Sequence, residues 1–101
     1  MKILIKRPYT EIKILDVNST NLPNLENELG YKFSIFQLSR GYVLLLPINK
    51  SCYDEPNFVV EDIYVNGTAF IIKAGLNRLL DLTEDAITDV NEMITFSNVL
   101  E

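Results

Sequence analysis

Apolar and charged positions alternate along the first seventeen residues, a pattern that predicts two β-strands. In the segment 2–7, Ile3 and Ile5 occupy alternate positions, and Pro8 ends the run. The segment 11–17 repeats the alternation. Because the linker between the two segments is short, we expect a hairpin with one solvated face.

The segment 22–29 has the spacing of a helix, since its three leucines recur at intervals of three and four. The polar cluster 18–21 offers N-cap residues, and Pro23 suits the first turn. Gly30 is well suited to the position just past the helix end. The pattern therefore predicts a helix over 22–29.

Two strands are predicted next, separated by a turn over 39–41. The segment 31–38 alternates apolar and polar residues. The segment 42–48 is almost continuously apolar, which is typical of a central strand covered on both faces. The polar segment 49–57 is predicted to be a loop.

Two β-rich runs, 58–65 and 68–73, flank Asn66 and Gly67. An Asn-Gly pair between such runs predicts a hairpin turn. One long strand with a bulge at Gly67 is the alternative. The segment 74–78 is predicted to be a loop.

The last helix is predicted to begin after Thr83, a good N-cap that is followed by two acidic residues in the first turn. Leu82 is placed to pack on Ile87 as a hydrophobic staple. Val90 and Ile94 follow Ile87 at helical spacing, so the three are expected to form the buried face.

The predicted order of elements is β-β-α-β-β-β-β-α, in a single compact domain over residues 1–101. Runs of strands with two separate helices predict the α+β class. We expect an antiparallel or mixed sheet of about five to six strands, with two helices packed on one face. The residues expected to be mostly buried are Leu25, Leu29, Phe33, Ile35, Val43, Leu45, Phe70, Ile72, Ile87 and Val90.

The composition argues against an enzyme. The chain has 101 residues, no histidine, one cysteine (Cys52) and four widely spaced glycines. It therefore lacks the commonest general base and metal ligand, and it has no glycine-rich phosphate loop. We expect no catalytic residue, no cofactor and no metal. An enzyme that uses a pair of carboxylates is an alternative, but nothing singles out a pair among the 14 acids.

No apolar run approaches the roughly 18 residues that span a bilayer. The N-terminus lacks the long apolar stretch and the cleavage site of a signal peptide. A cytoplasmic protein with no membrane contact is predicted.

Charge is distributed unevenly along the chain. Residues 1–50 carry seven basic and four acidic residues, a net charge of +3, whereas residues 51–101 carry two and ten, a net charge of −8. Such a field can steer association with a basic partner. The acids that we expect to form a partner-binding surface, rather than to stabilise the fold, are Asp54, Glu55, Glu61, Asp62, Asp85, Asp89 and Glu92. A solvated helix face is the alternative explanation of this charge.

The aromatic residues near 31–42 and the basic N-terminal strands allow a second interpretation, a small nucleic-acid-binding protein. The net charge of −5 makes nucleic acid a less favoured partner. Self-association stays open.

Several short motifs follow one another in a familiar order. They include the opening Lys2-Ile3-Leu4-Ile5, the helix end Leu29-Gly30-Tyr31, the run Gly67-Thr68-Ala69-Phe70-Ile71-Ile72 and the helix start Leu82-Thr83-Glu84-Asp85. In these motifs the chain resembles domain-of-unknown-function family 3846, which comprises small phage, plasmid and mobile-element proteins of Gram-positive bacteria. The resemblance implies a mobile-element origin and assigns no activity or site residue. The chain departs from the family pattern at Asn57-Phe58 and in the segment 49–55.

Together these features favour a non-enzymatic protein-interaction module. The hypothesis is a phage or mobile-element accessory protein that binds and modulates a host protein with a basic surface. An anti-defence inhibitor is one specific form of it.

Overall fold

The fold combines two helices with two antiparallel sheets in the computed structural model, which describes residues 1–48, 55–75 and 78–95. The α+β class predicted from the sequence is therefore confirmed. In chain order the elements are β1 (Lys2–Lys6), β2 (Lys13–Asp16), α1 (Leu22–Leu29), β3 (Phe33–Gln37), the short 3-10 helix η1 (Ser39–Gly41), β4 (Tyr42–Pro47), β5 (Pro56–Val60), β6 (Ile63–Asn66), β7 (Ala69–Gly75), β8 (Arg78–Leu80), α2 (Glu84–Met93) and β9 (Ile94–Thr95).

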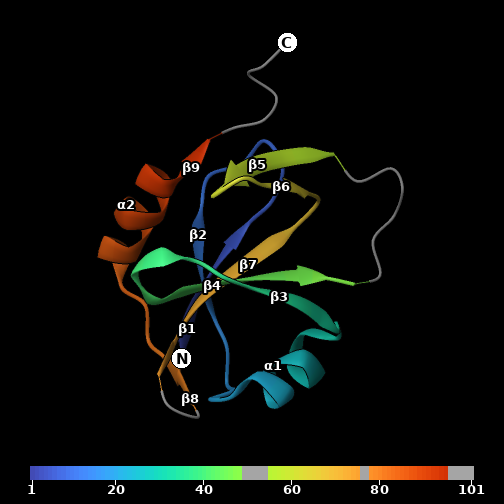
Figure 1. Ribbon diagram of the computed structural model, residues 1–101. Helices are drawn as coiled ribbons and strands as arrows, with labels where there is room; N and C mark the ends of the chain where they lie inside the picture. The colour runs from blue at the N-terminus through green and yellow to red at the C-terminus, as the bar shows by residue number, and fades with distance from the viewer. Residues whose placement is uncertain (49–54, 76–77, 96–101) are drawn as a thin grey trace.

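β7 lies at the centre of the larger sheet, whose strands run in the order β2-β1-β7-β4-β3 (Figure 1). All neighbouring strands pair antiparallel. β8 pairs with the end of β7 on the side opposite β4, so it continues the line of β1. The predicted loop over 74–78 was therefore wrong, because β7 extends to Gly75 and β8 begins at Arg78. β2 and β3 form the two long edges of this sheet.

The smaller sheet has the order β6-β5-β9. The run 58–65, predicted as one strand, is two strands joined by a tight turn, since Val60 pairs with Ile63. Glu61 and Asp62 form this turn with φ angles of 47° and 70°. Positive φ at both central residues is the geometry of a two-residue hairpin turn, although Asn and Gly adopt it most readily.

The hairpin predicted at Asn66 and Gly67 was wrong, and so was the long bulged strand. β6 pairs with β5, whereas β7 pairs with β1 and β4, so the two residues carry the chain from one sheet to the other. Gly67 has a φ of 73°, and its amide donates to the carbonyl of Glu55 at 2.7 Å. The left-handed backbone that favours glycine is thus used for a crossing between sheets.

The core lies in two layers, one on each face of the larger sheet. One cluster joins Ile3, Val43 and Phe70 of the sheet to Leu25 of α1. The other joins Leu44 and Ile71 to Val90 of α2 and to the inner residues of the smaller sheet. The helices therefore cover opposite faces, which corrects the expectation that both pack on one face (Figure 1).

Most of the predicted core is confirmed. Leu25, Phe33, Val43, Leu45, Phe70, Ile72 and Val90 are buried. Leu29 and Ile87 are half-buried, and both pack against the core clusters. Ile35 is 54% exposed, because it lies on the edge strand β3, where no neighbour covers it.

The helix boundaries follow from local residues. The Asn21 side chain accepts from the amide of Asn24 at 3.0 Å, and Gly30 ends α1 with a φ of 80°. Thr83 takes the predicted N-cap position of α2 without a side-chain capping bond. The helix ends at Met93, so Ile94 is buried from β9 rather than from the helix. No helix in the described part of the chain has the length and apolarity to cross a membrane.

Candidate functional site

Three of the predicted acids, Glu61, Asp89 and Glu92, contact η1, although they come from segments far apart in the sequence. The turn between β5 and β6 supplies Glu61 and Asp62. Glu61 accepts two hydrogen bonds at Oε2, from the amide of Ser39 at 2.8 Å and from its hydroxyl at 2.7 Å. The turn is therefore held against the first residue of η1.

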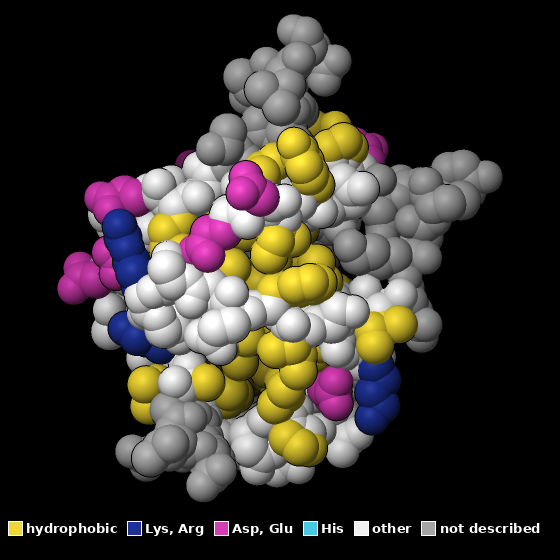
Figure 2. All heavy atoms as spheres, viewed as in Figure 1, with side chains coloured by type: hydrophobic (Ala, Val, Ile, Leu, Met, Phe, Trp, Pro, Cys, Tyr) yellow, Lys and Arg dark blue, Asp and Glu magenta, His cyan; other side chains and the backbone are white. Residues whose placement is uncertain are grey.

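Helix α2 reaches η1 from the other side. The Arg40 Nη1 lies 3.8 Å from Asp89 Oδ1 and 3.4 Å from Glu92 Oε1. Asp85 lies one helical turn before Asp89 on the same face. We name Glu61, Asp62, Asp85, Asp89 and Glu92 the acidic patch. Figure 2 shows acidic side chains over α2 and over the turn end of the β5–β6 hairpin, on one face of the molecule.

Tyr42 and Asp89 join the acidic patch to the core. Tyr42 is 2% exposed, and its hydroxyl donates to Asp89 Oδ2 at 3.0 Å. Burial raises the pKa of the Tyr42 hydroxyl, and the hydrogen bond to Asp89 adds to this effect. Asp89 therefore also serves folding, which corrects the expectation that these acids act only in binding.

Hydrogen bonds from Ser39 stabilise the negative charge of Glu61 in the acidic patch. The hydroxyl and then the amide of Ser39 lower the pKa of Glu61 by hydrogen bonding to its charged form. Arg40 contacts two of the five acids, and Asp62 and Asp85 are exposed. Lys73 Nζ also lies 5.2 Å from the centre of the Tyr42 ring, next to this surface. The arrangement can attract a basic surface, because the five acids outnumber Arg40 and Lys73.

Two of the seven predicted acids lie outside the acidic patch. Glu55 precedes β5, at the opposite end of that strand from Glu61. Its side chain bonds to Tyr9, which raises the pKa of the Tyr9 hydroxyl. Asp54 lies outside the described residues.

Exposed apolar residues on β3 and β6 were missed by the sequence reasoning. Ile35 and Phe36 of β3 and Tyr64 of β6 are exposed, Tyr64 by 71%. Figure 2 shows hydrophobic side chains gathered in the middle of one face, on both sides of β3. The adjacent apolar pair Ile35-Phe36 was the available signal, since neighbouring strand residues point to opposite faces.

A buried polar cluster links the two sheets. Lys6 is 2% exposed, and its Nζ donates to Asn57 Oδ1 at 2.8 Å and to the carbonyl of Arg7 at 3.0 Å. The Asn57 amide donates to the carbonyls of Lys6 at 2.9 Å and Gly67 at 2.7 Å. Burial lowers the pKa of Lys6. These bonds hold β1, β5 and the crossing at Gly67 together, which is a structural role.

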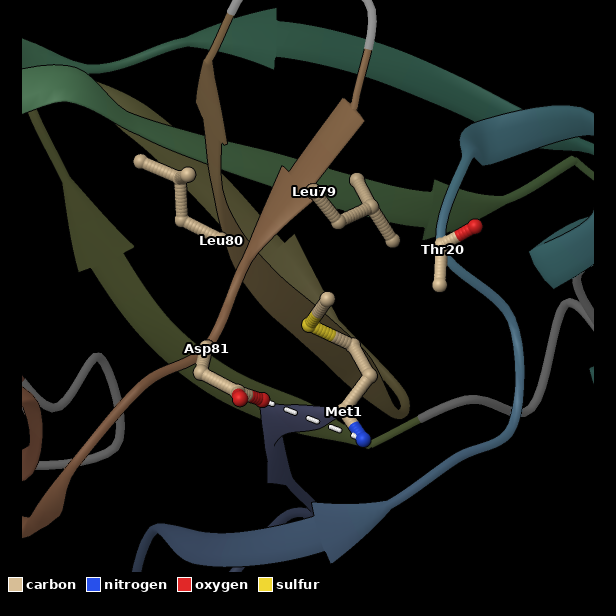
Figure 3. A pocket seen from close by; sticks show the side chains of 5 residues that line it. All are labelled: Met1, Thr20, Leu79, Leu80 and Asp81. Atoms are coloured by element: carbon tan, nitrogen blue, oxygen red, sulfur yellow. Dashed lines mark ion pairs between the residues drawn. The ribbon is translucent and has the colours of Figure 1, made fainter.

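A pocket of about 450 Å³ lies beside β8. It is lined by Met1, Thr20, Leu79, Leu80 and Asp81 (Figure 3). The Met1 amine lies 3.8 Å from Asp81 Oδ1, and that oxygen also accepts from the amide of Lys2 at 2.7 Å. The carboxylate is thus already used in holding the first residues of the chain against β8.

In residues 1–48, 55–75 and 78–95, no three Cys, Asp or Glu side chains are grouped so that they could hold a metal ion. Comparisons with protein-family models, with curated proteins and with solved structures find no match to the chain.

Proposed function

We propose that the protein is a non-enzymatic interaction module that binds a host protein through the acidic patch. One observation carries the proposal: acids from the β5–β6 turn and from α2 meet at η1. Ser39, Arg40 and Tyr42 give Glu61, Asp89 and Glu92 partners within the fold. Among the described residues Asp62 and Asp85 have no such partner and are exposed, so folding does not account for these two like charges beside the others. A basic partner surface would gain from them both attraction and faster association.

The edge of the acidic patch adds an apolar contact. Tyr64 follows Asp62 by two residues and is largely exposed. Tyrosine is enriched among the residues that dominate binding energy at protein interfaces. The partner surface that fits is therefore a basic one with an apolar position for the Tyr64 ring.

The biological setting in this proposal rests on the family resemblance. A phage or mobile-element accessory protein that modulates a host protein is consistent with an acidic module of this size. An anti-defence inhibitor is the specific form that we would test first. The alternative, nucleic-acid binding through the N-terminal strands, is weakened because Lys6 is buried and cannot reach a phosphate.

Affinity capture tests the proposal. The bait proteins are the wild type, the double variant Asp62→Lys/Asp85→Lys, and Glu55→Lys as the control outside the acidic patch. A specific protein should be recovered by the wild type and by Glu55→Lys and lost with the double variant. Recovery of the same proteins by all three baits would refute the acidic patch as the binding surface.

Association kinetics with the recovered protein sharpen the test. Charge steering predicts that the double variant associates more slowly than the wild type, with the largest difference at low salt. An association rate independent of both salt and charge reversal would show that the acidic patch is ordinary solvated surface.

A further inference from the structure

β3 is an edge strand without the usual protection against pairing. Its outer side has no strand partner among the described residues. Natural edge strands are commonly blocked by charged residues, proline or bulges. β3 reads Phe-Ser-Ile-Phe-Gln and contains none of these, whereas the opposite edge β2 begins with Lys13 and ends with Asp16. The open edge of β3 is therefore suited to accept another strand.

The hydrogen-bonding groups of this edge are symmetric about Ile35. The amide of Ile48 donates to the carbonyl of Lys32 at 2.8 Å, and the amide of Leu38 donates to the carbonyl of Tyr42 at 2.9 Å. Residues 32 and 38 therefore face β4, and so do 34 and 36, because bonding alternates along an antiparallel strand. Phe33, Ile35 and Gln37 direct their backbone groups outward.

One of these outward groups is already satisfied. The amide of Phe33 donates to Glu26 Oε2 at 3.0 Å. The carbonyl of Phe33 and both backbone groups of Ile35 and Gln37 remain on the open side. An antiparallel strand of the same sequence, centred on Ile35, would pair the amide and carbonyl of Ile35 with those of its counterpart, and the amide of Gln37 with the carbonyl of Phe33. The carbonyl of Gln37 would face the Phe33 amide, which already donates to Glu26.

Apolar side chains flank the edge on both faces. Ile35 lies opposite Leu45, on the face covered by α1, and is 54% exposed. Phe36 lies opposite Leu44, on the other face, and is 37% exposed. Strand addition would cover part of both side chains.

Charge at the two ends of β3 suits a second copy of this chain as the occupant, because each end carries both signs. Lys32 Nζ lies 3.8 Å from Glu26 Oε1 at one end, and Arg40 lies next to the Ser39–Glu61 contact at the other. Lys32 and Arg40 flank the strand, and the carboxylates of Glu26 and Glu61 lie at its two ends through their bonds to Phe33 and Ser39. In a pairing centred on Ile35, Lys32 of the second copy falls opposite Leu38, next to the Ser39–Glu61 contact. Arg40 of the second copy falls opposite Gly30, whose amide is bonded to the carbonyl of Glu26.

We propose that two copies of the protein associate through β3, antiparallel and about a two-fold axis at Ile35. The two larger sheets then become one continuous sheet. Such a contact is isologous, as in most homodimers. This inference goes beyond the proposed function, because Asp62 and Asp85 of each copy stay free for another partner.

Sedimentation equilibrium of the full chain tests the association. The wild-type mass should rise with concentration from 11.6 kDa toward twice that value. Ile35→Lys should remain monomeric, since a lysine on an edge strand blocks pairing. Tyr64→Lys, on the edge strand β6 of the other sheet, should still dimerise. A wild type that stays monomeric throughout, or an Ile35→Lys variant that dimerises as well as the wild type, would overturn the proposal.

Disulfide trapping tests the register independently, in a Cys52→Ser background. Ile35→Cys places two cysteines opposite each other, with Cα atoms about 5.5 Å apart, a separation that a disulfide spans. Gln37→Cys is the matched control, because its two copies would lie about 13 Å apart along the strands at roughly 3.3 Å per residue. Oxidised glutathione should link Ile35→Cys at least tenfold faster. Equal rates, or faster linkage of Gln37→Cys, would refute this register.

The two proposals can fail separately. Loss of the dimer in Ile35→Lys with capture of the host protein retained would support both. The wild type could instead be monomeric, while Ile35→Lys loses the captured host protein. That result would assign the β3 edge to a strand of the host protein and overturn self-association. Circular dichroism of each variant identifies loss of folding, and the trapping experiment does not depend on Ile35→Lys.

Discussion

Leu45 lies directly opposite Ile35 in the ladder between β3 and β4, yet Leu45 is fully buried and Ile35 is 54% exposed. The two side chains point to the same face of the sheet. The difference arises because β4 is internal, whereas β3 is at the edge. Position within the sheet, rather than apolar character, therefore decides which of the two contributes to the core.

The pair gives a matched test of this difference. Leu45→Ala should lower the free energy of unfolding by about 2–5 kcal/mol, as expected for a buried leucine. Ile35→Ala should change it by no more than about 0.5 kcal/mol, as for most surface substitutions, when measured in urea at low protein concentration. A loss below about 1 kcal/mol for Leu45→Ala would contradict the central place of β4.

Asp89 should contribute to stability through Tyr42. Asp89→Ala leaves a buried hydroxyl without its acceptor, so we expect the free energy of unfolding to fall by about 1–3 kcal/mol. Tyr42→Phe removes the donor and should cost less. In urea melts, adding Tyr42→Phe to Asp89→Ala should recover part of the loss. If the losses in the free energy of unfolding of the two single variants simply add in the double variant, the hydrogen bond does not couple Tyr42 and Asp89.

Asn57 should be the most sensitive polar residue at the contact between the sheets. Asn57→Ala removes three hydrogen bonds and leaves the buried carbonyls of Lys6 and Gly67 without that donor. We expect a loss of at least about 1–3 kcal/mol in denaturant melts. Asn66→Ala, on an exposed position of β6, is the control and should be nearly neutral. Equal effects of the two substitutions would contradict the role of the cluster.

Glu28 should make stability depend on acid pH. Its carboxylate accepts hydrogen bonds from the Ser19 hydroxyl and from the amides of Asn18 and Ser19, and these bonds lower its pKa below the usual 4.5. Because the unfolded chain binds this proton at a higher pH, the stabilisation is complete above pH 4.5 and is lost as pH falls through the folded pKa.

The comparison is between the wild type and Glu28→Gln in urea melts across this acid range. The wild type should lose stability more steeply than the variant as pH falls. Parallel curves would show that the carboxylate does not contribute. Glu11→Gln, on an exposed position without such bonds in the described structure, controls for general acid effects.

Local residues allowed the helix boundaries to be predicted, whereas the arrangement of elements depended on distant contacts. Asn21, Pro23 and Gly30 define α1 through bonds to their immediate neighbours. Which face of the larger sheet each helix covers depends instead on the order of the strands. That order is set by contacts between distant residues and cannot be read from a local sequence pattern. The turn at Glu61 was missed because glutamate is uncommon at positive φ.

The candidate site shows the same division. Helical spacing was sufficient to place Asp85, Asp89 and Glu92 on one face of α2. Their approach to Glu61 depends on Ser39 and Arg40, which are far from both in the sequence. The adjacent apolar pair Ile35-Phe36 was not enough to predict the exposure of Ile35, because that also required knowing that β3 is at the edge.

The left-handed backbone of the β5–β6 turn places partner binding and thermal stability in opposition. Asp62 has a φ of 70°, where glycine relieves the strain that a Cβ atom causes. Asp62→Gly should raise the melting temperature slightly and weaken partner capture. Thermal melts and binding measurements test this expectation. A variant in which melting temperature and partner binding both rise, or both fall, would contradict it. Selection for thermostability alone would then remove a carboxylate from the acidic patch. A variant selected for thermostability would therefore bind its partner less tightly, and Asp62 is the position where we expect that binding to be lost first.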